Sequence, residues 1–135
     1  MKANQLTTTA IDQALSGCSE VESYMAAVVY ENDDVELSLG NADIRHTKNA
    51  DIRHTKTDGV LGASIAYYIR INWKSRASPF ILYMTKDDVI KKARKLSCAY
   101  NEETKTFGNG PWKEDFDTMA LNLVKRMACW YTGIA

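Results

Sequence analysis

The segment from Gly110 to Tyr131 constrains the fold of this chain more than any other stretch. Gly110 and Pro111 interrupt helices, so they end a loop, and the acidic residues that follow suit the positive end of a helix dipole. Beyond them, apolar residues recur at spacings of three and four, the period of an amphipathic helix. They are Phe116, Met119, Ala120, Leu123, Val124, Met127 and Tyr131. The pattern predicts a helix over 115–131 with one face in a core.

The other side of this predicted helix carries Asn122, Lys125, Arg126 and Cys129. The two cations lie toward the C-terminal end, where the helix dipole favours positive charge by roughly 0.3–1 kcal/mol each. The same side chains are also suited to hold phosphate groups. Both interpretations stay open, and DNA contact by Lys125 and Arg126 requires other cations on the same side of the molecule.

A second helix is predicted over 86–97. Thr85 is a suitable N-cap with Asp88 three residues later, and an apolar stripe follows. The outer face carries four cations within five positions, which repel one another. They are Lys91, Lys92, Arg94 and Lys95. A bound anion would relieve this repulsion, and solvation of the helix end is the alternative.

The longest strand pattern runs over 60–74, where residues alternate between two faces. One face is apolar and the other is mixed: Ile65, Tyr67, Ile69, Ile71 and Trp73 against Ala66, Tyr68, Arg70, Asn72 and Lys74. We expect the first face to be buried and the second to be exposed. Cations beside an aromatic ring are typical of surfaces that bind single-stranded nucleic acid, although an exposed face is polar for solubility alone.

Further strand patterns predict a hairpin over 21–39, turning at 32–34, and a strand over 79–84. Together these elements predict an α+β fold, with an antiparallel sheet of about three to five strands packed against the two C-terminal helices. Residues 1–19 are expected to be a short separate segment with one weak helix over 9–16, followed by a single domain over 20–135.

The sequence contains a perfect tandem repeat, because the segment 41–48, Asn-Ala-Asp-Ile-Arg-His-Thr-Lys, recurs as 49–56. A duplication is tolerated in a surface loop, where added length costs little closure entropy, so we expect a solvated loop insertion. One alternative is a metal site from Asp43, His46, Asp51 and His54. The other is a basic loop that touches nucleic acid through Arg45, Lys48, Arg53 and Lys56. The ligand spacing matches no known metal site, so we predict no metal.

Composition is that of an ordinary soluble globular protein, with 45% hydrophobic and 25% charged residues. No run approaches the ~18 apolar residues of a membrane span, and the N-terminus does not resemble a signal peptide. The three cysteines form no CxxC pair, which favours a reducing cytoplasm. Both histidines lie in the repeat and there is no glycine-rich phosphate loop, so we predict no enzyme, no catalytic residue and no cofactor.

Charge is divided unevenly along the chain. Residues 1–59 contain five Lys or Arg against ten Asp or Glu, whereas residues 60–135 contain twelve against seven. Such a division produces a basic surface for a polyanion, unless the two halves cancel when they pack together.

Three segments, in this order, resemble the RecT family of phage single-strand DNA annealing proteins. They are Val28-Val29-Tyr30-Glu31-Asn32-Asp33, then Phe80-Ile81-Leu82-Tyr83-Met84-Thr85-Lys86-Asp87-Asp88-Val89, and Gly110-Pro111-Trp112 with the following 115–120. The resemblance spans residues 20–131. Since family members are longer, it implies a shortened member that lacks the N-terminal part of the family domain.

The resemblance implies ATP-independent binding and annealing of single-stranded DNA in a positively charged groove, by a homo-oligomeric ring or filament. A partner exonuclease or a host single-strand-binding protein is a further expectation. The candidate DNA-binding residues are Arg45, Arg53, Arg70, Lys74, Lys91, Lys92, Lys95, Trp112, Lys125 and Arg126. The alternative is a phage-derived oligomerisation or protein-interaction module without annealing activity.

Overall fold

The computed structural model describes residues 8–38, 46–47, 51–76, 78–96, 100–101, 103–104, 106–108 and 111–134. The elements are α1 (Thr8–Gly17), β1 (Val21–Tyr30), β2 (Asp34–Ser38), β3 (His46–Thr47), β4 (Asp51–Thr55), β5 (Ser64–Trp73), β6 (Phe80–Thr85), α2 (Lys86–Leu96), β7 (Tyr100–Asn101), β8 (Thr106–Phe107), α3 (Pro111–Glu114) and α4 (Phe116–Thr132). The fold is therefore α+β, as predicted.

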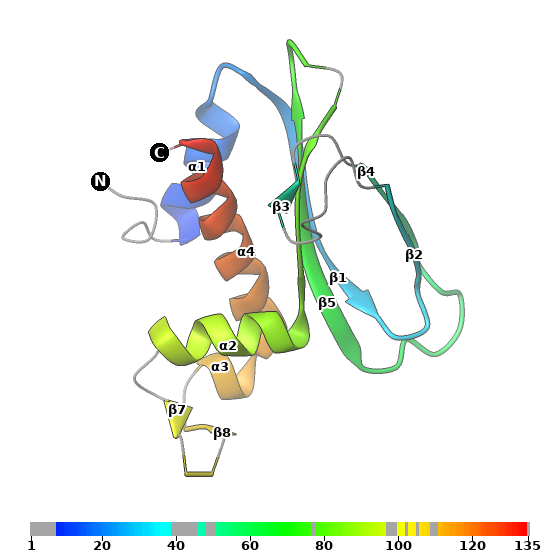
Figure 1. The fold of residues 1–135 in the computed structure, drawn as a ribbon, viewed down its shortest axis with the longest axis vertical. Helices are drawn as coiled ribbons and strands as arrows, with labels where there is room; N and C mark the ends of the chain where they lie inside the picture. Colours follow the sequence, from blue (N-terminus) through cyan, green and yellow to red (C-terminus); the bar gives the residue numbers. More distant parts are fainter. Residues whose placement is uncertain are drawn as a thin grey trace.

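Three layers make up the fold (Figure 1). The central layer is an antiparallel sheet with strand order β1-β5-β6-β3. The helices cover one face of this sheet, and a two-stranded ribbon formed by β2 and β4 lies over the other. Because side chains alternate along a strand, the middle strand β5 contributes Tyr67, Ile69 and Ile71 to the helical side, and Ala66 and Tyr68 to the ribbon side.

Helix α4 packs on the sheet through its buried side chains and through a short hydrogen bond. Tyr67 on β5 donates its hydroxyl proton to Asp117 Oδ1 at 2.6 Å. Asp115 caps the start of the helix, and Gly133 ends it at a φ of 76°, a left-handed conformation that favours glycine. The buried residues of α4 are Ala120, Leu123, Val124, Met127, Ala128 and Cys129.

The N-terminal helix is part of the same core. Ile11 and Leu15 of α1 are 1% and 0% exposed and belong to the helical-side cluster. The predicted stripe of α4 contains two errors, and the packing of α1 explains the first of them. Cys129, expected on the polar side, is buried in the cluster that includes α1 residues, whereas Tyr131, expected in the core, is 46% exposed.

The predicted hairpin over 21–39 is wrong in its pairing, although both of its strands exist. Strand β1 pairs with β5, and β2 pairs with β4 in the separate ribbon. The register places Leu37 opposite Ile52, and both side chains pack in the ribbon-side cluster. Burial against residues distant in sequence therefore decided the pairing, not the short turn between the strands.

The second copy of the repeat is not the solvated loop that the sequence suggested. It forms β4, in which Ile52 is 7% exposed and points into the ribbon-side cluster. Of the first copy, the structure describes only His46 and Thr47, which pair with Leu82 and Ile81 of β6. Residues 41–45 and 48, which include Asp43, Arg45 and Lys48, lie outside the described part of the chain.

The ribbon also corrects the expectation of one exposed face on β5. Ala66 and Tyr68 are each only 1% exposed, because the ribbon covers this half of the strand. Toward the other end of β5, Arg70 and Asn72 remain partly exposed. The mixed face is thus divided into a buried part and an open part.

Replacing a buried α1 residue tests whether this helix belongs to the core. Leu15→Ala should lower the free energy of unfolding by roughly 2–5 kcal/mol, because it opens a cavity beneath α4. Gln13→Ala is the matched control, since Gln13 is exposed on the same helix. Urea denaturation measures both variants, and equal losses would contradict the packing of α1.

Candidate nucleic-acid interface

The ribbon is attached to the sheet through a buried polar network centred on His54. Its Nε2 lies 2.8 Å from Asp33 Oδ2, and its Nδ1 lies 3.0 Å from the Tyr68 hydroxyl. The two side chains are 5% and 0% exposed for His54 and Asp33. The Asp33 carboxylate also accepts the backbone N–H groups of Tyr30 and Thr57, both at 3.0 Å. Every partner is a fixed protein group, which is typical of a structural network.

These hydrogen bonds lower the pKa of Asp33 to about 2. The largest cause is the backbone N–H of Tyr30, followed by the hydrogen bonds from His54 and Thr57. Burial raises the pKa of Tyr68. With its proton on Nε2, His54 donates to Asp33 and accepts from Tyr68, so both ring nitrogens are engaged. His54 is therefore not available as a metal ligand, and within the described ranges no three His, Cys, Asp or Glu side chains gather at one point.

A cavity of about 340 Å³ opens between the ribbon and the sheet. Its lining carries both signs of charge: Glu36, Asp51, Ile52, Arg53 and Arg70. Arg70 forms an ion pair with Asp51 at 3.3 Å. A phosphate group entering here would meet two carboxylates, so the positive charge of the arginines is largely compensated. This cavity is poorly suited to a polyanion.

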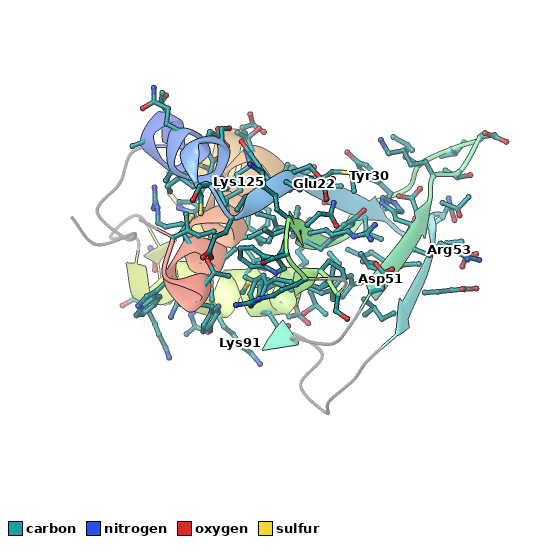
Figure 2. All side chains as sticks on the ribbon, turned by 90° about the horizontal axis from the view of Figure 1, so that it is seen from above. Glu22, Tyr30, Asp51, Arg53, Lys91 and Lys125 are labelled. Atoms are coloured by element: carbon teal, nitrogen blue, oxygen red, sulfur yellow. The ribbon has the colours of Figure 1, made fainter. Side chains whose placement is uncertain are left out.

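The predicted DNA-binding residues do not form one surface. Arg53 and Arg70 belong to the ribbon side, whereas Lys91, Lys92 and Lys95 lie on α2, on the opposite side of the sheet. Figure 2 shows Arg53 at the outer edge of the ribbon, far from both Lys91 and Lys125. Lys74 is exposed just beyond the end of β5. The condition that would have made Lys125 and Arg126 DNA contacts is not met within one chain.

Lys125 is held inside the protein. Its Nζ lies 3.1 Å from Asp12 Oδ1 on α1, and the same oxygen accepts the hydroxyl of Tyr24 at 3.1 Å. Its side chain is only 20% exposed. Arg126, the neighbouring residue, is partly buried and has interactions within the protein. Lys125 therefore connects α4 to α1, whereas the structural interpretation of the sequence explained both cations by the helix dipole alone.

The Trp112 ring packs against other side chains of the protein. Its ring meets Phe116 edge-on, with centroids 5.4 Å apart and planes at 65°, and it packs against the helical-side core. Arg45 lies outside the described residues. Neither residue adds to an open basic surface in the described part of the protein.

In the part of the chain that the structure describes, a concentration of positive charge lies on the α2 basic face, defined by Lys91, Lys92, Arg94 and Lys95. Lys91, Arg94 and Lys95 are exposed, and among the described residues neither Lys91 nor Lys95 has an ion-pair partner. Lys92 lies over the ring of Trp130, with its Nζ 5.4 Å from the ring centroid. The sequence analysis did not single out Trp130. The sequence did contain an indication of its exposure, because Trp130 is a large aromatic residue outside the apolar stripe of its helix.

No helix in the described part of the chain is long and apolar enough to cross a membrane.

Truncation of His54 tests the attachment of the ribbon. His54→Ala should lower the free energy of unfolding by roughly 1–3 kcal/mol, because it leaves Asp33 and Tyr68 buried with a lost partner. Thr55→Ala is the matched control, since Thr55 is the exposed neighbour of His54 on the same strand. Urea denaturation at neutral pH compares them, and equal losses would contradict the network.

The depressed pKa of Asp33 predicts a dependence of stability on pH. Its pKa is about 2 in the folded protein against an ordinary value of 3.8, so the ionised carboxylate stabilises the folded state. This contribution is complete above the ordinary pKa and is lost as pH falls toward about 2. The stability difference between the wild type and Asp33→Asn should therefore shrink over that range in acid titrations monitored by urea unfolding. A constant difference would argue against the assignment.

A known protein family matches most of the chain. No curated protein matches the chain. The RecT family matches over residues 9–133, which takes in α1, the central sheet, the ribbon and α4. The match begins earlier than the resemblance noted in the sequence and includes the core residues of α1. On this match, which covers nearly the whole chain, the protein belongs to the RecT family, a family of single-strand annealing recombination proteins.

Proposed function

We propose that this chain binds single-stranded DNA and anneals complementary strands without ATP, with the α2 basic face as its main phosphate contact. The observation that carries this proposal is the concentration of exposed cations on α2, away from the carboxylates of the ribbon. Family membership supports the activity, and the charge distribution supports the surface.

Electrostatics favours α2 over the other candidate surfaces. A lysine or arginine without an internal ion pair binds a phosphate most favourably. It releases a counterion from the DNA and breaks no ion pair within the protein. Lys125 and Arg70 would have to give up their contacts with Asp12 and Asp51. Lys91 and Lys95 have no such ion pair among the described residues.

Annealing needs no bond chemistry from the protein. Lysine and arginine neutralise the phosphates of each strand, a contact independent of sequence, and base pairing supplies the specificity. The proposal therefore includes no catalytic residue, no metal and no cofactor.

The proposed assembly is a homo-oligomeric ring or filament acting in the cytoplasm, with an exonuclease or a host single-strand-binding protein as further partners. An oligomer aligns the α2 basic faces of several copies, and each copy then adds phosphate contacts to one strand.

The second candidate function is an oligomerisation or protein-interaction module without annealing activity. It is favoured by the compensated charge of the ribbon-side cavity and by a formal net charge of zero for the whole chain. The two candidates differ in whether the chain binds single-stranded DNA at all.

A salt titration distinguishes them. We expect the purified chain to bind a labelled oligonucleotide at ~50 mM salt and to lose affinity steeply toward ~200 mM, because counterion release drives phosphate contacts. Fluorescence anisotropy measures the affinity at each salt concentration. Absence of binding at low salt would favour the interaction module.

Charge reversal locates the surface. Lys91→Glu combined with Lys95→Glu should weaken binding about tenfold or more for all sequences alike, and should reduce the slope of log affinity against log salt by about 2. Arg53→Glu is the comparison, since Arg53 is an exposed cation on the ribbon side. A larger loss for Arg53→Glu would place the interface over the ribbon instead.

A further inference from the structure

We propose that Trp130 and Tyr131, which we call the aromatic platform, stack on the bases of single-stranded DNA while the α2 basic face holds its phosphates. The inference rests on the proposed function and identifies a base-binding part of that site. Neither aromatic residue was among the candidates from the sequence.

Both residues of the platform are exposed, although Tyr131 was expected in the core. Trp130 is 59% exposed and Tyr131 is 46% exposed, at the last turn of α4. Their rings are nearly parallel, with an interplanar angle of 16° and centroids 6.4 Å apart. Exposure of two adjacent large aromatic residues is costly in water, and flat aromatic faces are what unpaired bases stack upon.

Positive charge lies directly against the platform. Lys92 Nζ is 5.4 Å from the centre of the Trp130 ring, so α2 and the end of α4 meet through these two side chains. Lys95 follows one helical turn after Lys92, on the same side of α2. A nucleotide carries a flat base and an anionic phosphate a short distance apart, which matches an aromatic ring beside an ammonium group. Charge complementarity therefore selects a nucleic-acid strand as the occupant.

The cation–π contact between Lys92 and Trp130 also suggests how single-stranded DNA binds. An exposed cation–π contact is weak and readily exchanged. When a strand binds, a base takes over the face of Trp130 and the ammonium of Lys92 turns to a phosphate. Both groups keep a favourable contact throughout, so the exchange needs no rearrangement of the backbone. Stacking of this kind tolerates every base, as strand annealing requires.

The test compares oligo(dT) with an abasic oligonucleotide of the same length, using the full chain and fluorescence anisotropy at low salt. Trp130→Ala should weaken binding of oligo(dT) by about 5- to 150-fold, the range expected for loss of one stacked base. Binding of the abasic strand should show no comparable loss, and the salt dependence should keep its slope, because the cations remain. Val60→Ala, at an 81% exposed position outside the platform, is the control.

Trp130→Phe provides a second readout. It keeps an aromatic face, so it should retain most of the affinity for oligo(dT). The quenching of tryptophan emission by oligo(dT) should largely disappear in this variant, since Trp73 and Trp112 are partly buried in the core. Circular dichroism confirms that each variant is folded.

Several outcomes would overturn the inference. Equal losses on oligo(dT) and on the abasic strand would show that Trp130 acts through structure or charge and not through stacking. A change in oligomeric mass of Trp130→Ala without DNA would identify the platform as a contact between copies. If the wild type shows no salt-sensitive binding to any strand, the proposed function itself fails; wild-type binding with unchanged affinity of Trp130→Ala overturns the platform alone.

Discussion

Two consecutive tyrosines of β5 hold the three layers together. Tyr67 points to the helical side and donates to Asp117 of α4, while Tyr68 points to the ribbon side and contacts His54 of β4. The two residues are 0% and 1% exposed. Because neighbouring residues on a strand face opposite ways, one dipeptide connects the middle of the sheet to both outer layers. Loss of the Tyr68 hydroxyl would leave the buried His54 with one partner fewer, and loss of the Tyr67 hydroxyl would remove its hydrogen bond to Asp117.

Because helices cover one face of the sheet and the ribbon covers the other, some cations lie beside carboxylates and others do not. The ribbon side keeps its arginines beside Glu36 and Asp51, and α1 supplies Asp12 to neutralise Lys125. Lys91 and Lys95 of α2 have no such ion pair among the described residues. An overall charge of zero therefore conceals a local excess of positive charge, and the location of carboxylates decides which lysines are available to a polyanion.

Several features could be predicted from periodicity because their cause is local. The spacing of apolar residues indicated α4 and α2, alternation indicated β5, and strand-like composition between turns indicated β1 and β6, all within a few residues of their observed ends. Other features depend on contacts between distant segments. Cys129 is buried because α1 packs beside α4, and Tyr131 is 46% exposed although it lies in the predicted apolar stripe. No local pattern contains that information.

The tandem repeat shows the difference between local spacing and contacts with distant segments. By itself, the sequence determined α2, α4 and the strands β1, β5 and β6, and where cations gather on α2, since these follow from side-chain spacing. Only the tertiary structure decided which strands pair with one another. The same dipeptide, His-Thr, pairs with β6 at 46–47 and with β2 at 54–55. Pairing depends on which distant apolar surface remains to be covered, and identical segments meet different surfaces.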